Sequence, residues 1–199
     1  MIETSARPES RAPAPLLIVT GAVGLLASFV LSVDKVQQLQ DKIAGNESVF
    51  ACDFSVWVSC SSVMASAQSE AFGFPNSFLG VIGFAVVLTL GVVWLADTDV
   101  KGWIWGGLQA GTVFGIAFVT WLQFQSIYKI GSLCPYCMVV WAVMIPLFVV
   151  GTAHSLRRWA PAAGITRVVS NWTVLIIALW YVAVLAAIWF EFGTRVLGS

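Results

Sequence analysis

Charged residues are scarce in this sequence. Only 10% of the 199 residues are Asp, Glu, Lys or Arg, whereas 59% are hydrophobic. A soluble domain carries about 25% charged residues. This chain has too few polar groups to cover a surface that faces water, so its composition indicates a membrane protein in contact with lipid.

The few charges also balance each other. Ten basic residues are matched by ten acidic ones, so no excess positive charge is present to bind nucleic acid. Histidine occurs once, as His154, which we place in a cytoplasmic loop away from any catalytic role. The apolar segments lack the buried acids and histidines that ion pathways use, which argues against a transporter.

Five apolar segments stand out, at about 16–33, 77–96, 103–125, 133–153 and 172–192. Each is near the ~20 residues that a spanning helix needs. An open sheet would leave backbone groups unpaired in lipid. We therefore predict an all-α integral membrane protein with five transmembrane helices. The first segment also resembles a signal peptide near its end, but its length and the five-span topology favour a span.

The basic residues indicate an orientation. With a cytoplasmic N-terminus, six lie inside and four outside. The inner set is Arg7, Arg11, Lys101, Arg157, Arg158 and Arg167, and the outer set is Lys35, Lys42, Lys129 and Arg195. The positive-inside rule then places the loop 34–76 on the outer face of the plasma (inner) membrane.

The expected domain organisation is simple. Residues 1–15 are predicted to be a disordered cytoplasmic tail, 16–193 a single membrane domain, and 194–199 a tail whose last two residues are typical of a cloning remnant. Within the outer loop 34–76, the first span is expected to continue as a helix to about Gly45. Pro75 marks the start of the second span. Gly107, Gly111 and Gly115 form a stripe that predicts close helix packing.

All four cysteines lie on the predicted outer side. Cys52 and Cys60 belong to "CDFSVWVSC" in the outer loop, and Cys134 and Cys137 form "CPYC" at the start of the fourth span. Disulfides persist in that compartment. Three interpretations compete: two structural disulfides, a zinc site made of four cysteines, and a thiol–disulfide relay.

The residues favour the relay. A Cys-x-x-Cys bridge closes a very small loop and stabilises a fold only weakly, and the wide spacing of the first pair is wrong for a structural zinc site. Cys134 precedes a helix that starts at Pro135, where the helix dipole favours a thiolate. Asp53, beside Cys52, is expected either to raise the pKa of that thiol or to be solvated.

A dithiol at the membrane edge needs a two-electron carrier that dissolves in the membrane. Lipid quinones of the menaquinone or ubiquinone type meet this requirement. The pair on the outer loop can instead reach a soluble protein. We therefore expect one pair to face a protein and the other to face a quinone.

The order of these motifs resembles the vitamin K epoxide reductase family in its bacterial branch. The wide pair in the first outer loop precedes "CPYC" on the fourth span, and "CSSVMASAQSEAFGFPNSFLG" leads from Cys60 into the second span. The similarity covers about 50–150 well. It implies a four-helix bundle around a quinone pocket, with one further peripheral helix.

The resemblance also implies a role for each cysteine. Cys52 would exchange with a partner thiol, Cys60 would pass electrons to Cys134, and Cys137 would donate them to the quinone. Cys60 must then reach both Cys52 and Cys134, which requires a mobile loop. Asn76 matches an asparagine that hydrogen-bonds a quinone carbonyl in relatives, although Asn there also suits a helix cap.

Further residues are candidates for the quinone wall. Met64, Phe78, Met138 and Trp141 are the ones we select, although each could serve as ordinary packing. Trp141 stands where many vertebrate members carry a tyrosine, which puts epoxide reduction in doubt and leaves quinone reduction intact.

The sequence therefore predicts a membrane thiol–disulfide oxidoreductase that supports disulfide bond formation. It would reoxidise a secreted thioredoxin-like oxidase and pass the electrons to quinone. Many bacterial relatives carry a thioredoxin-like domain after the fifth span, and this chain stops at residue 199, so we expect the partner to be a separate protein. The alternatives are a membrane protein with two structural disulfides and a transporter that contains thiols.

Overall fold

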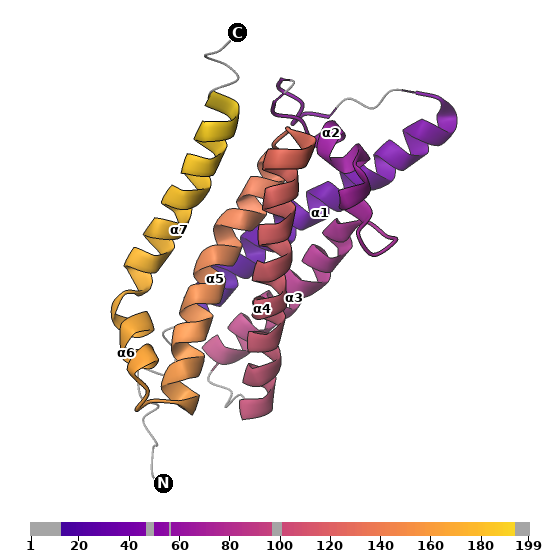
Figure 1. The fold of residues 1–199 in the computed structure, drawn as a ribbon. Helices are drawn as coiled ribbons and strands as arrows, with labels where there is room; N and C mark the ends of the chain where they lie inside the picture. Colours follow the sequence, from indigo (N-terminus) through magenta and orange to yellow (C-terminus); the bar gives the residue numbers. More distant parts are fainter. Residues whose placement is uncertain (1–12, 47–49, 56, 97–100, 194–199) are drawn as a thin grey trace.

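The computed structural model describes residues 13–46, 50–55, 57–96 and 101–193. Helices account for most of them (Figure 1). The long helices are α1 (Ala14–Ala44), α3 (Asn76–Leu95), α4 (Gly102–Phe124), α5 (Pro135–Trp159) and α7 (Thr173–Ile188). Shorter helical segments are α2 (Cys60–Ala65), η2 (Ala67–Glu70), η3 (Gln125–Ile130), α6 (Gly164–Asn171) and η4 (Trp189–Gly193).

Within the described residues, five helical segments are long and apolar enough to cross a membrane. They are Ala14–Ala44, Asn76–Leu95, Gly102–Ile130, Pro135–Trp159 and Thr173–Gly193. The predicted five-span, all-α fold is therefore confirmed. The first, third and fourth segments end well beyond the predicted bounds because polar turns continue these helices past the apolar core. Of the predicted tails, residues 1–12 and 194–199 lie outside the described residues, while the end of the predicted N-terminal tail, at 14–15, already belongs to α1.

The ends of the helices follow local sequence signals. α1 continues beyond its apolar part and ends before Gly45, which has φ 75°. Glycine adopts this left-handed conformation without strain. α3 follows Pro75, and α5 begins at Pro135 with Cys134 as its N-cap. The helix end and the two proline positions predicted from the sequence are thus confirmed.

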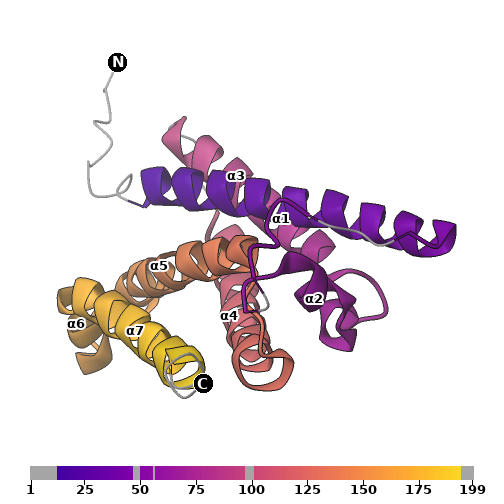
Figure 2. The ribbon, with the colours of Figure 1, turned by 90° about the horizontal axis from the view of Figure 1, so that it is seen from above.

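The first four long helices form the bundle, and α7 lies at its edge. Figure 2 shows α1 and α3 crossing on one side, with α7 beside α5 on the opposite side. No residue of α7 is buried within the protein, so lipid has to cover most of its apolar surface. The predicted arrangement of four helices and a peripheral fifth is therefore confirmed.

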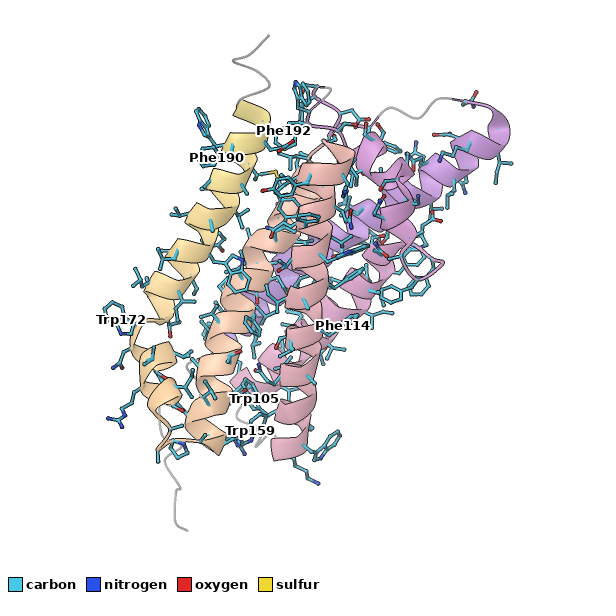
Figure 3. All side chains as sticks on the ribbon, in the orientation of Figure 1. Trp105, Phe114, Trp159, Trp172, Phe190 and Phe192 are labelled. Carbon is cyan, nitrogen blue, oxygen red and sulfur yellow. A yellow bond between two sulfur atoms is a disulfide. The ribbon has the colours of Figure 1, made fainter. Side chains whose placement is uncertain are left out.

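We call the two ends of the bundle the cysteine end and the tryptophan end. The cysteine end holds α2, the loop with Cys52 and Cys60, and the start of α5; Phe190 and Phe192 are at this end in Figure 3. Trp105 and Trp159 mark the tryptophan end. His154 is part of α5 and contacts the rings of Trp94 and Trp105 at 5.2 and 4.8 Å between ring centres. The prediction that it lies in a loop is wrong, because α5 continues two turns past its apolar part.

Helices pack closely between α1 and α3, whereas the predicted glycine stripe packs closely at only one of its three positions. A β-carbon at Gly21 of α1 would lie 2.7 Å from the backbone nitrogen of Leu88 on α3. By contrast, Gly107 and Gly111 have no atom within 4 Å of such a position. These two glycines line an open cavity. A β-carbon at Gly115 would instead lie 2.5 Å from Met144 Cε on α5. The interpretation of the stripe as close helix packing therefore holds at Gly115 and is wrong at Gly107 and Gly111.

This difference predicts opposite outcomes for two equivalent substitutions. Gly21→Ala should destabilise the protein by about 1–3 kcal/mol, because the added methyl group meets backbone that cannot rotate away. Gly107→Ala gains the same helix propensity and should not be destabilised. Thermal unfolding in detergent measures both. Equal midpoints for the two variants would contradict the packing described here.

Candidate functional site

The wide cysteine pair forms a disulfide. Cys52 and Cys60 are joined by an S–S bond of 2.02 Å, while Cys134 and Cys137 are free thiols. Cys60 is the first residue of α2, and Ser59 caps that helix by accepting a hydrogen bond from the Ser62 backbone N–H. One sulfur of the disulfide is therefore fixed at a helix start.

A short backbone pairing attaches the disulfide loop to the start of α5. Val58 and Leu133 form a parallel bridge. The Ser59 N–H donates to the Leu133 carbonyl at 3.0 Å, and the Leu133 N–H donates to the Trp57 carbonyl at 2.8 Å. Cys60 and Cys134 directly follow Ser59 and Leu133. The pairing therefore brings two segments that are distant in the sequence into a register that aligns their cysteines.

The result is a close contact between the two pairs. Cys134 Sγ lies 3.2 Å from Cys60 Sγ. Cys52, Cys60 and Cys134 have exposed fractions of 4%, 0% and 0% and belong to one apolar cluster with Phe50 and Leu31. In this conformation Cys60 is bonded to Cys52 and already contacts Cys134, so it reaches both partners at once.

The position of Cys134 before a helix affects its acidity. A hydrogen bond with the Cys137 side chain lowers the pKa of the Cys134 thiol, and the backbone N–H groups of Tyr136 and Cys137 add to this effect. Burial and the Asp34 carboxylate oppose it without reversing it. The direction agrees with the sequence argument, and the thiolate is the reactive form in disulfide exchange.

Cys137 faces a large cavity. This cavity has a volume of 680 Å³ and is lined by residues of α1, α3, α4, α5 and the segment 63–69. Along α4 it extends from Ser126, just beyond the helix, to Trp103 near its start. At 1.5 Å per residue that path is about 35 Å long. Its walls are mostly apolar, and glycines of α3 and α4 provide much of the width.

The cavity includes three of the five predicted quinone contacts. Met64, Asn76 and Trp141 line it together with Cys137. Trp141 follows Cys137 by four residues, so both lie on one face of α5.

The other two, Phe78 and Met138, are not among the residues that line this cavity. Phe78 is two positions after Asn76, which turns it to the other side of α3, where it borders a shallow groove with α1. Met138 is one position after Cys137 and packs into the main apolar core.

The Asn76 side chain binds the segment that covers the cavity. Its Nδ2 donates to the Gln68 carbonyl at 2.6 Å, and its Oδ1 accepts from the Ala71 N–H at 3.1 Å. It makes no side-chain cap for α3. A primary amide has two donors and two lone pairs, so Asn76 retains capacity for one further hydrogen bond of each kind.

Lys35 is a cavity residue that the sequence argument missed. Its buried ammonium group donates to the Met64 carbonyl at 2.5 Å and to Ser69 Oγ at 3.3 Å, and it pairs with Glu70 at 2.8 Å. Gln38, one turn later, donates to the Ser61 carbonyl at 3.0 Å. Lys35 and Gln38 are three positions apart and therefore lie on one face of α1. They fasten α2 and η2 to α1.

The described parts of the chain offer no set of side chains that could bind a metal ion. There, no group of three or more His, Cys, Asp or Glu side chains is placed to hold an ion. Cys60, which contacts Cys134, is already bonded to Cys52. The geometry is that of two neighbouring thiol–disulfide pairs.

A model of the vitamin K epoxide reductase family matches residues 15–152. The chain belongs to the vitamin K epoxide reductase family. The match runs from the start of α1 almost to the end of α5 and so contains the bundle, all four cysteines and most of the cavity lining. A comparison with curated proteins found no match. As a family member with five candidate spans, this vitamin K epoxide reductase homologue is a multi-pass membrane disulfide oxidoreductase.

The sulfur contact predicts efficient crosslinking. A variant with Cys52→Ala and Cys137→Ala retains Cys60 and Cys134, whose sulfurs are 3.2 Å apart. Mild oxidation with diamide should join them almost completely within the folded protein, because no chain movement is needed. Alkylation with a mass tag measures the remaining thiols. The matched control, Cys60→Ala with Cys137→Ala, should crosslink more slowly; equal rates in the two variants would contradict the geometry.

The ion pair at the cavity predicts a pH dependence. The hydrogen bond and charge of Lys35 lower the pKa of the Glu70 carboxyl group. A lowered folded pKa means that the stabilisation is complete above the ordinary carboxyl pKa and is lost as pH falls below about 4.

Glu70→Gln should therefore melt below the wild type at neutral pH and converge with it in acid. Thermal melts in detergent from about pH 7 to about pH 3 would show this. In a Lys35→Met background the same substitution should have no effect that depends on pH. A constant difference at every pH would exclude the ion pair as its cause.

Proposed function

We propose that the protein is a quinone-dependent thiol oxidase that restores the disulfide of a secreted thioredoxin-like oxidase. One observation carries the proposal. Cys60 is bonded to Cys52 and lies 3.2 Å from Cys134, while Cys137 faces the cavity. The cysteines form an uninterrupted path for electrons from the loop to the cavity.

The first exchange takes place at Cys52. A thiolate of the reduced partner attacks Cys52 Sγ, which forms a mixed disulfide and releases Cys60 as a thiolate. The second thiol of the partner then resolves the mixed disulfide and leaves Cys52 reduced. Cys52 is buried in this conformation, so its cover has to open before the partner can reach it.

The second exchange takes place between neighbouring sulfurs. Cys60 attacks Cys134 of a Cys134–Cys137 disulfide and releases Cys137, and Cys52 then displaces Cys134 to restore the Cys52–Cys60 bond. Two electrons move from the loop pair to the second pair. Backbone N–H groups at the start of α5 stabilise Cys134 as the thiolate that leaves.

The cavity fits a lipid quinone. Its length beside α4 suits an isoprenoid tail, and polar groups lie at the end near Cys137. Ser77 Oγ lines the cavity and is buried without a hydrogen-bond partner among the described residues. Ser77 and Asn76 would hold the ring carbonyls, and Trp141 and Met64 would pack against the ring. A quinone bound there would accept the two electrons and two protons that the Cys134–Cys137 dithiol releases.

The orientation follows from the same chemistry. We place the cysteine end outside the cell membrane, in agreement with the basic residues at 101, 157, 158 and 167 on the opposite side. A secreted partner meets the loop there, and the quinone reaches the cavity from the lipid.

A quinone reduction assay tests the relay. The purified protein is given a ubiquinone or menaquinone analogue, with either a reduced thioredoxin-like oxidase or dithiothreitol as donor. Cys137→Ala should abolish turnover with both donors, because it removes the thiol that faces the cavity. Cys52→Ala should lose only the protein donor, since dithiothreitol can reduce the second pair directly.

Two results would overturn the proposal. A wild-type protein that consumes no quinone with either donor would favour two structural disulfides. Full turnover by Cys137→Ala would show that electrons leave by another route. Phe78→Ala is the matched control for the cavity, because Phe78 lies on the other side of α3 and its loss should leave turnover unchanged.

A further inference from the structure

Asp53 follows Cys52 directly, and its carboxylate binds the loop at three points. Oδ2 accepts a hydrogen bond from the Phe50 N–H at 3.0 Å. Oδ1 accepts from the Ser59 hydroxyl at 2.8 Å and from the Ser61 N–H at 3.0 Å. The side chain is therefore neither simply solvated nor only a charge beside a thiol, which were the two roles expected from the sequence.

These donors flank both cysteines of the disulfide. Ser59 and Ser61 are the residues immediately before and after Cys60, and Phe50 lies two residues before Cys52. The carboxylate thus connects the same two chain segments as the S–S bond, by a separate set of contacts. The backbone pairing of Ser59 with Leu133 holds one of these segments on α5.

Reduction of the disulfide removes the covalent link, and the carboxylate contacts are then a remaining connection between the two segments. Closing a flexible loop costs conformational entropy, and the disulfide closes one with a sequence separation of 8. We propose that Asp53 is a positioning residue that keeps the reduced loop closed, with Cys52 beside Cys60, so that the disulfide re-forms readily. The inference rests on the proposed function in one respect, because it requires this pair to cycle between disulfide and dithiol.

The charge state of Asp53 supports this role. Burial alone would raise the pKa of its carboxyl group, but the hydrogen bonds from Phe50, Ser61 and Ser59 together hold the pKa below its ordinary value. The group is thus a carboxylate at neutral pH. Hydrogen bonds to a charged acceptor are stronger than those between neutral groups.

The contacts and the disulfide must stabilise each other. We call the three contacts of the Asp53 carboxylate the clasp. If the clasp is complete in the disulfide state and partly lost in the dithiol state, it favours the disulfide, and the disulfide favours the clasp by the same free energy. Loss of Asp53 should therefore make the Cys52–Cys60 bond easier to reduce. Typical coupling energies correspond to about a tenfold change in the equilibrium constant, which is about 30 mV for a two-electron couple.

The experiment isolates this pair from the rest of the relay. The full chain carrying Cys134→Ser and Cys137→Ser is equilibrated with mixtures of reduced and oxidised dithiothreitol. Each reduced dithiothreitol gives two electrons and two protons to the Cys52–Cys60 disulfide and becomes the cyclic disulfide. Alkylation and mass spectrometry then give the fraction of protein dithiol.

Asp53→Ala should shift the midpoint by about 30 mV toward easier reduction. Asp53→Asn should shift it by less, because the amide oxygen still accepts from Ser59 and Ser61 and only the contact with Phe50 is lost. Glu70→Ala is the matched control: it removes another carboxylate of the same outer segment, one that pairs with Lys35, and it should leave the midpoint unchanged.

Two outcomes overturn the proposal. An Asp53→Ala midpoint equal to the wild-type midpoint excludes the clasp, and equal shifts for Asn and Ala show that only the charge acts. If Asp53→Ala fails to fold, Ser59→Ala replaces it, and a midpoint unchanged by that substitution overturns the proposal. This assay involves no quinone, so failure of the relay in the quinone assay and failure of the clasp here are separate results.

Discussion

The backbone pairing between the disulfide loop and the start of α5 is the constraint on which the rest of the site depends. Two hydrogen bonds, Ser59 to Leu133 and Leu133 to Trp57, connect segments that are far apart in the sequence. Cys60 and Cys134, which follow them, are 74 positions apart. Successive side chains of an extended segment point to opposite faces. A slip of one residue would turn Cys60 away from Cys134, so a very small pairing determines whether the two thiol pairs can exchange.

Burial protects the sulfurs of the site but also limits access to them. Cys60 and Cys134 are fully buried and Cys52 nearly so, which shields the reactive thiols from small oxidants and from unrelated proteins. The same burial would prevent the proposed partner from reaching Cys52 while the loop is closed. The segment around Cys60 is held against α5 by the hydrogen bond from Ser59 to Leu133 and against α1 by the hydrogen bond from Gln38 to the Ser61 carbonyl. Opening is therefore expected on the Cys52 side, with Cys60 remaining against Cys134.

Two pairs of helices in the bundle are packed differently: α1 and α3 are in close contact, whereas a cavity separates parts of α3 and α4. α1 and α3 approach so closely that Gly21 faces the backbone of α3. Between α3 and α4, Gly107 and Gly111 instead leave space for the cavity. Glycine serves both purposes because its lack of a side chain allows either close contact or open volume, depending on where the neighbouring helix lies. The tight pair also carries Lys35 and Gln38, which hold the cover of the cavity in place.

The sequence by itself determined the class of the protein, the five spans, the helix starts at Pro75 and Pro135, and the grouping of the four cysteines at one end. These features depend on local composition and spacing, because a long apolar segment in lipid satisfies its backbone hydrogen bonds by forming a helix. Only the tertiary structure decided that Cys60 touches Cys134, that Phe78 and Met138 face away from the cavity, and that Asp53 binds both flanks of Cys60. Each of these depends on how a helix is rotated or where a loop returns, and that is set by packing between segments distant in the sequence.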